Sequence, residues 1–254
     1  LGDRLVAPVI LKELFEIDDS VPLVGYDSPS GKAFACKNLG EPQGDLMAMI
    51  CEPSIPMRMD QITALDEFPG AGLVKCIDSG VVNWASSGRR QPVLIFEKPA
   101  GSRVFETMES VITPLTDDQI ISGFLTPAVA TLREFSARGL THRNIRPSNL
   151  FYSDESARLI MLGECVSAPP GYNQPLIFES LECGLAVETG RGAGTPADDL
   201  FALGVTLLSL LIGRNPVPQI DDPYTFMLNR INTGSYANIV GNHRIQMNMM
   251  ELLR

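Results

Sequence analysis

A short polar stretch, THRNIRPSN, carries side chains that could do chemistry. The imidazole of His142 can exchange a proton near neutral pH, whereas the amide of Asn144 can hold a hydroxyl group but cannot accept its proton. Arg143 and Arg146 could form a small anion pocket, and Asn149 could give one oxygen to a metal ion. Each residue also has a plainer reading, as a packed histidine, a surface arginine or a turn-forming asparagine.

The bulk composition excludes several classes of function. The chain has 254 residues, of which 44% are apolar and 20% charged, enough for one large domain or two small lobes with a core. Thirty acidic residues against twenty basic ones give a net charge of −10. A nucleic-acid partner would therefore be repelled, and none is expected.

Five widely spaced cysteines, with no C-x-x-C pair and only two histidines, argue against a zinc site and for a reducing compartment, which we take to be the cytoplasm. The longest apolar run, residues 200–213, is too short to cross a bilayer. The sequence starts at Leu1 and stops inside a helix-like pattern. We therefore expect a piece of a longer protein, whose other parts could still reach a membrane.

The elements that must position the polar stretch fall into two halves. The first hundred residues hold short apolar runs between turn formers, at 20–39, 70–82 and 90–98, which predict strands of an antiparallel sheet. Helical spacing at 54–65 predicts one helix that interrupts this sheet.

The second half has a helical texture. A capping-box spacing at Thr116 opens a predicted helix that ends near Gly139. Further segments are predicted as two short strands and three helices, at 150–152, 158–162, 199–212, 223–231 and from 245 onward. A sheet-rich half followed by a helical half is typical of a segregated α+β architecture.

The order of these elements, together with several motifs, resembles the eukaryotic-like protein kinase family from about residue 31 to the end. THRNIRPSN resembles the H-R-D-x-K-x-x-N catalytic loop, with Asn144 in place of the catalytic aspartate and Asn149 at the metal-binding asparagine. FACK resembles V-A-I-K and puts Lys37 at the lysine that pairs with ATP. The resemblance gives His142 and Arg143 structural roles.

Two further motifs extend the resemblance. VLIFEKPAG is similar to the strand and hinge that clamp adenine, with Phe96 as gatekeeper and Glu97, Lys98 and Pro99 in the hinge. DLFALG is similar to the motif that opens the central helix of the larger lobe, with Asp199 supporting the catalytic loop. Where A-P-E would be expected, LIFES retains only its glutamate.

The chain departs from the family where phosphoryl transfer needs oxygen or glycine. RLIMLGE replaces K-I-x-D-F-G and puts Met161 at the magnesium-binding aspartate, with Glu164 as the nearest acid. A thioether is a poor ligand for Mg²⁺. No G-x-G-x-x-G precedes Lys37, and the helix that should present a glutamate to it offers Arg58 or Met59 instead.

The resemblance implies a two-lobed protein-kinase-like fold, with a small lobe at 1–98 and a larger helical lobe at 99–254 that is incomplete at its end. The losses predict a pseudokinase, a protein-binding or regulatory module whose cleft is empty or holds ATP without a metal ion. One alternative is an active serine/threonine kinase or nucleotidyl transferase with a non-standard metal site built from Asn149 and Glu164. Another is a nucleotide sensor that changes affinity for a protein partner when ATP binds.

Overall fold

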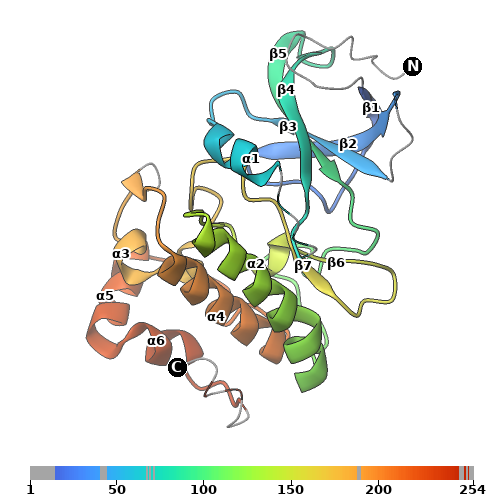
Figure 1. Cartoon of the computed structure of the whole chain (residues 1–254). Coiled ribbons are helices and arrows are strands. Elements are labelled where there is room, and N and C mark those ends of the chain that lie inside the picture. The colour runs from blue at the N-terminus through green and yellow to red at the C-terminus, as the bar shows by residue number, and fades with distance from the viewer. Residues whose placement is uncertain are drawn as a thin grey trace.

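Two lobes, one rich in strands and one rich in helices, make up the chain (Figure 1). The computed structural model describes residues 15–40, 45–66, 68, 70, 72–187, 190–245, 249 and 251. The small lobe is a five-stranded antiparallel sheet with the order β1-β2-β3-β5-β4. Its strands are β1 (Phe15–Pro22), β2 (Gly31–Asn38), β3 (Leu46–Cys51), β4 (Cys76–Trp84) and β5 (Arg89–Glu97). The expected order, a sheet-rich lobe followed by a helical lobe, is therefore confirmed.

The central strand β3 has the sequence LMAMIC and is buried along its whole length. It has no polar side chain because both of its faces pack against apolar residues. Met47 and Met49 face the core shared with the helical lobe, whereas Ala48 and Ile50 face a second cluster around Trp84. Alternate side chains of one strand thus join two separate cores.

The helix α1 (Met59–Leu65) is shorter than the predicted segment 54–65. Pro56 disfavours helical backbone at Ile55, and the N–H of Arg58 donates to the carbonyl oxygen of Val166 at 2.9 Å and not to an earlier residue of a helix. The helix begins only after Arg58, whose side chain is not used as a helix cap. As described below, this arginine reaches into the other lobe instead.

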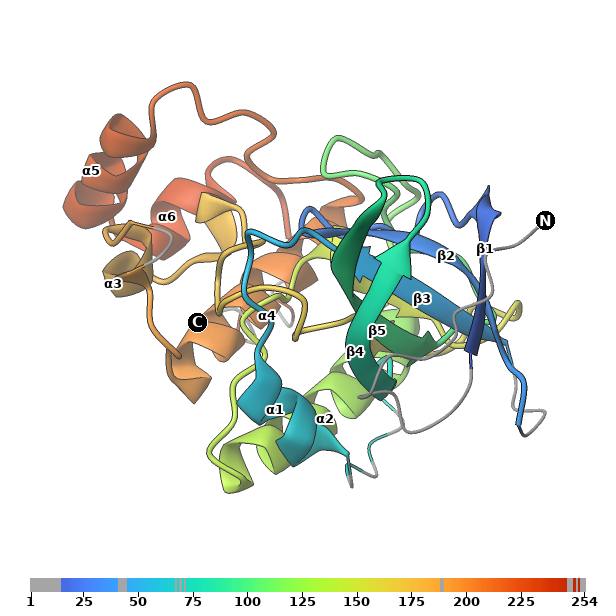
Figure 2. The same ribbon diagram turned by 90° about the horizontal axis from the view of Figure 1, so that it is seen from above.

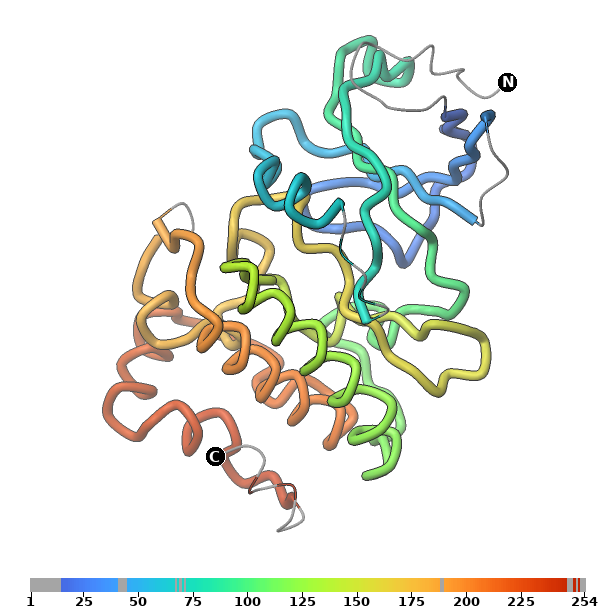
Figure 3. Tube along the Cα trace, viewed as in Figure 1, coloured from blue at the N-terminus to red at the C-terminus, as the bar shows by residue number. Residues whose placement is uncertain are grey.

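The helical lobe follows the predicted order of elements with shifted boundaries (Figure 3). The predicted helix from Thr116 is split into the π-helix η1 (Gln119–Leu125) and α2 (Thr126–Ala137). The elements after α2 are η2 (Pro147–Asn149), β6 (Leu150–Tyr152), β7 (Ile160–Leu162), η3 (Leu176–Phe178), α3 (Leu181–Gly184), α4 (Pro196–Ile212), α5 (Pro223–Thr233) and α6 (Ser235–Val240). Most of the predicted helix from 245 onward lies outside the described residues.

The buried helix α4 starts at a capping box, in which Thr195 and Asp198 each bond the other's backbone N–H. It ends at Gly213, whose φ of 70° is the left-handed conformation that glycine adopts readily at the end of a helix. The helices α5 and α6 lie away from the sheet in both views (Figures 1 and 2). Within the described part of the chain, no helix is long and apolar enough to cross a membrane.

Candidate functional site

The polar stretch after α2 is buried at the base of the small lobe and is held by the first turn of α4. The backbone N–H groups of His142 and Arg143 donate to the two carboxylate oxygens of Asp199, each at 2.7 Å. Arg143 has a φ of 57°, a conformation that costs energy in a non-glycine residue and that this clamp maintains. Asp199 therefore lies where the sequence predicted, beneath the loop.

The imidazole of His142 is buried and bonds only to neighbouring backbone groups. Its Nδ1 accepts from the N–H of Asn144 at 3.3 Å, and its Nε2 lies 3.2 Å from the carbonyl oxygen of Gly163. Because Nδ1 is an acceptor, Nε2 carries the proton and donates to that carbonyl. Burial lowers the pKa of His142 to about 3, so the ring is neutral at physiological pH. This geometry fits the structural role predicted for His142.

Asn144 uses both ends of its amide inside the protein. Its Nδ2 donates to Glu164 twice, to the backbone oxygen at 2.9 Å and to Oε1 at 3.0 Å. Its Oδ1 accepts a hydrogen bond from Arg146. An aspartate at this position could not donate to Glu164, so the local contacts require the amide.

Glu164 is the acid that contacts the side chain of Asn144, and its carboxylate oxygens are fully used. Besides Asn144, the donors are the N–H of Val166 at 3.0 Å, the N–H and hydroxyl of Ser167 at 2.9 and 2.7 Å, and the hydroxyl of Ser28 at 3.2 Å. A carboxylate offers about four lone-pair sites, so five donors saturate it.

Met161 lies in β7 with its Cα opposite that of Phe151, and it is Glu164 that contacts Asn144. The sequence interpretation put Met161 at the metal-binding position; in the structure Glu164 holds the place beside the loop asparagines. Nearby, the Nδ2 of Asn149 donates to the carbonyl oxygens of Asn144 at 2.7 Å and Glu164 at 2.9 Å. Among the described residues, no group of three or more histidines, cysteines and acids could hold a metal ion.

Lys37 is not on the strand that the sequence interpretation assigned to it. In protein kinases the ATP-pairing lysine is on the third strand, whereas Lys37 is exposed on β2, with its Cα opposite that of Glu16 on β1. The third strand, β3, presents Met47, Met49 and Cys51 to the shared core. The assignment was wrong because it matched the four residues FACK without establishing which strand of the sheet they form.

The residues predicted for the hinge lie at the end of β5, which contains Phe96 and Glu97, and directly after it, at Lys98 and Pro99. Phe96 is buried, with its Cα opposite that of Met47, and lines an apolar cavity of about 10 Å³. Glu97 is exposed, and the ammonium of Lys98 lies 5.5 Å from the ring centre of Tyr26. The carbonyl oxygen of Pro99 accepts a hydrogen bond from the Tyr26 hydroxyl at 3.2 Å.

Arg58, one of the two residues expected in place of the helix glutamate, precedes α1 and connects the lobes. Its guanidinium donates to the carbonyl oxygens of His142 and Cys165, both at 3.0 Å, and of Thr141 at 2.9 Å. From α1, Gln61 adds a hydrogen bond of 3.0 Å to the Thr141 carbonyl. The small lobe is therefore held to the loop that contains His142 by hydrogen bonds to neutral backbone acceptors.

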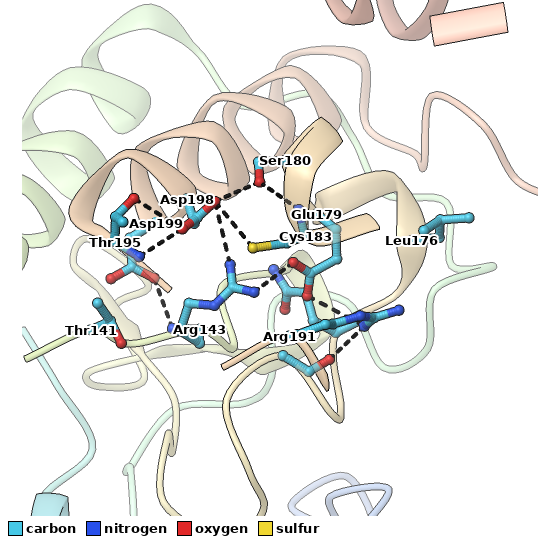
Figure 4. A network of polar contacts seen from close by, with 12 residues as sticks. Thr141, Arg143, Leu176, Glu179, Ser180, Cys183, Arg191, Thr195, Asp198 and Asp199 are labelled. Carbon is cyan, nitrogen blue, oxygen red and sulfur yellow. Dashed lines mark hydrogen bonds and ion pairs between the residues drawn. The ribbon is translucent and has the colours of Figure 1, made fainter. Parts of the chain in front are cut away.

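A buried ion-pair network holds the segment between β7 and α3 (Figure 4). Glu179, the glutamate retained from the A-P-E position, lies 2.7 Å from Arg143 and 3.4 Å from Arg191. The backbone oxygen of Glu179 also accepts from Arg230 at 2.9 Å. Arg143 is thus paired with an acid of the chain itself and does not form the anion pocket considered for Arg143 and Arg146.

Sequence reasoning missed the turn between β1 and β2, residues 23–30, as part of the site. Tyr26, Ser28 and Ser30 from this turn reach the other lobe through side-chain hydrogen bonds. The available signal was the hydroxyl-rich sequence YDSPS, found where the family carries glycines. The cavity that borders His142, Asn144 and Glu164 has a volume of about 10 Å³, at the limit for one water molecule.

Comparison with known proteins agrees with a two-lobed protein-kinase-like fold. No protein-family model matches the sequence. The chain is 27% identical over 135 residues to human ribosomal protein S6 kinase alpha-2, a match that covers 48% of this chain and 18% of that kinase. The crystal structure of Rad53 1–466 in complex with AMP-PNP superposes with a TM-score of 0.64 and 13% identity, over 94% of this chain and 60% of the Rad53 chain. This chain thus spans less than two thirds of either one.

Proposed function

We propose that this chain, which has the fold of a protein kinase, is a pseudokinase domain that transfers no phosphate and serves as a protein-binding or regulatory module. The observation that carries the proposal is the state of Glu164. It is the acid beside Asn144 and Asn149, and its carboxylate accepts five hydrogen bonds from the chain itself. A Mg²⁺ ion would have to displace several of these donors before it could bind.

Three other features support the same conclusion. Asn144 has no basic site, so it cannot provide the general-base help that contributes about 10²–10⁴-fold in rate. The third strand, β3, presents two thioethers and a thiol to the shared core. In a protein kinase the lysine that pairs with the phosphates of ATP lies on this strand. The cavity of about 10 Å³ at the loop is far smaller than the roughly 300 Å³ at which small-molecule sites begin.

One observation favours a second candidate, an active kinase or nucleotidyl transferase. Asn149 lies next to Glu164, with its Nδ2 donating to the Glu164 backbone oxygen at 2.9 Å, and a carboxylate and an amide oxygen are both ligand types that suit a hard cation. If the contacts of Glu164 opened on nucleotide binding, this pair could hold Mg²⁺ or Mn²⁺. We rank this candidate second because five contacts would have to be exchanged.

The test is a nucleotide titration followed by an assay of turnover. Thermal shifts with ATP, recorded with EDTA, Mg²⁺ or Mn²⁺, separate the candidates, since a ligand that binds the folded state raises the melting temperature. The pseudokinase proposal expects no metal-dependent shift and no transfer of label from α- or γ-labelled ATP. Turnover by the wild type that disappears in Glu164→Gln would overturn it, whereas Lys37→Ala, on an exposed strand position, is the matched control.

The proposal extends to location and partners. A protein partner in the cytoplasm fits the free cysteines and the net charge of −10. Affinity capture with the isolated domain, compared with the same domain carrying Arg58→Ala, tests whether the closed arrangement of the lobes is what a partner recognises. Equal capture of the same proteins by both forms would contradict that recognition.

A further inference from the structure

The turn 23–30 lies between the lobes and fills the cleft with its own side chains. The ring of Tyr26 stacks on that of Phe151 in β6, with centroids 5.3 Å apart and an interplanar angle of 12°. Its hydroxyl lies 3.2 Å from the carbonyl oxygen of Pro99 and 3.1 Å from that of Gly101, in the segment after β5. A planar ring on an aromatic platform, with its polar edge on the chain after β5, is the arrangement that a bound nucleobase would need.

A second group of contacts holds the far end of the turn. Ser28 donates to Glu164 at 3.2 Å, and the hydroxyls of Ser30 and Ser167 are 2.7 Å apart. Asn173 donates to Ser28 at 3.0 Å and to Ser30 at 2.8 Å. These contacts occupy the place beside Glu164 that phosphate and metal would take, so the turn covers both the ring and the anionic end of the cleft.

The turn has the features of a segment that can leave without unfolding either lobe. Gly25 has a φ of 94° with no atom within 4 Å of a Cβ built on it, and Val24 is 85% exposed. Tyr26 and Ser28 are only half-buried. Tyr26 packs against the edge of the shared apolar core, and the other contacts of the two side chains are hydrogen bonds and ring stacking. Arg103, which donates to the Asp27 carbonyl at 2.6 Å, lies on the opposite lobe and would remain in place.

We propose that residues 23–30 form an intramolecular plug, in which Tyr26 takes the place of a purine ring on Phe151 and controls whether the cleft can bind a nucleobase. This proposal rests on the proposed function, since a closed cleft is part of that argument. The ligand class is a planar nitrogen heterocycle such as a purine nucleotide, bound without a metal ion once the plug has left. A partner that binds the displaced turn would open the cleft, which couples partner and ligand binding.

The test compares Tyr26→Ala with the wild type, using ADP in EDTA and isothermal titration calorimetry. If the plug limits access, only the open fraction of wild-type molecules can bind ADP, so the apparent Kd of the wild type equals the intrinsic Kd divided by that fraction. Tyr26→Ala should therefore bind ADP at least about tenfold more tightly than the wild type. Tyr26→Phe keeps the stacked ring and should stay close to the wild type. The matched control Tyr224→Ala, at a residue 70% exposed on α5, should not change the affinity. Equal affinity of Tyr26→Ala and the wild type overturns the plug.

A measurement on the wild type alone keeps the proposal testable if Tyr26→Ala fails to fold. Tyrosine nitration by tetranitromethane, mapped by mass spectrometry, should modify Tyr224 at least about tenfold faster than Tyr26, since burial raises the Tyr26 pKa and its ring is covered. Equal rates overturn the plug. Neither experiment contains a metal ion, so a negative result contradicts the plug and leaves the proposed function untouched. The proposed function would be contradicted by phosphate transfer in the presence of Mg²⁺.

Discussion

Asn144 and Glu164 meet at 3.0 Å in the centre of the site, where an active kinase would keep two acids apart around metal and substrate. The amide donates to a carboxylate that also takes four other donors, and its oxygen accepts from Arg146. An aspartate at position 144 would have the same shape, but the donor that faces Glu164 would become an acceptor. The contacts of residue 144 therefore depend on its amide.

Asn144→Asp should lower the free energy of unfolding at pH 7 by about 1–3 kcal/mol, because a buried hydrogen bond is lost and two carboxylates face each other. The introduced acid has a raised pKa in the folded state, so the native protein holds more protons and the loss should shrink as the pH falls towards 5. Urea unfolding followed by Trp84 fluorescence measures both effects.

The exposed control Asn229→Asp on α5 should change stability by no more than about 0.5 kcal/mol. A stabilised Asn144→Asp variant, or one that gains phosphate transfer, would show that the amide contacts are unimportant.

His142 gives a pH dependence whose sign follows from its burial. Its pKa falls from 6.5 to about 3 in the folded state, so between these values the unfolded chain takes up a proton that the native protein refuses. Stability should therefore decrease as the pH falls from about 6.5, by up to about 1.4 kcal/mol per pH unit from this group. The contribution is fully present above pH 6.5.

Comparison with His142→Gln isolates this contribution, because glutamine does not titrate. Unfolding free energies at half-unit pH steps should converge between the wild type and His142→Gln on acidification. Parallel curves would mean that His142 is charged or exposed in the native state.

At the scale of elements, α1 and the catalytic loop form one unit through Arg58. Its guanidinium donates hydrogen bonds to three backbone carbonyl oxygens, those of His142, Cys165 and Thr141. Helix α1 has only seven residues, too short to be stable by itself, so its position depends on these tertiary contacts. Arg58 therefore determines both the position of α1 and how the two lobes are held together.

Arg58→Ala should cost about 2–4 kcal/mol of stability, since truncation leaves buried carbonyl groups without donors. Arg58→Lys should recover only part of this loss, because one ammonium cannot match the planar guanidinium at three acceptors. Arg133→Ala, the same truncation on the exposed face of α2, is the matched control and should cost no more than about 0.5 kcal/mol. Equal losses at both positions would contradict the role of Arg58.

Elements with strong local signals were predicted well, and contacts between elements were not. The end of α4 at Gly213 and the start of α5 at Pro223 follow from glycine and proline chemistry that acts within a few residues. Asp199 and Asn149 could be located because each lies in a short contiguous motif, and the structure places both beside the loop that contains Asn144. Lys37 was misassigned because a strand's place in the sheet depends on pairing with distant residues.

The contacts of the turn 23–30 with the helical lobe join residues far apart in the sequence, such as Ser28 and Glu164, which are 136 positions apart. No local pattern encodes such a pair. The composition of the turn could have indicated that it differs from a phosphate-binding loop, but the identity of its partners required the folded chain.

At the scale of the whole molecule, one core runs through both lobes. The cluster that contains Met47 and Phe96 from the sheet also contains Leu132, Leu150 and Leu207 from the helical lobe. Arg58 and the turn 23–30 add polar contacts across the same boundary. Two lobes that share a core and a set of buried hydrogen bonds should lose their structure together.

We expect a single cooperative unfolding transition. Trp84, the one tryptophan of the chain, is buried in the outer cluster of the sheet and reports on the small lobe. Far-UV circular dichroism reports mainly on the helical lobe. The two signals should give the same urea midpoint. Separate midpoints would show that the lobes are independent and that the shared core contributes little.

The apolar character of β3 would make a cation on this strand costly. A lysine introduced at Met49 would put an ammonium where the present side chain is 1% exposed, among apolar neighbours. Burial of an unpaired charge there would lower the stability of the core that both lobes share. Placing a phosphate-binding lysine on β3 would therefore need compensating changes around it and not a single substitution.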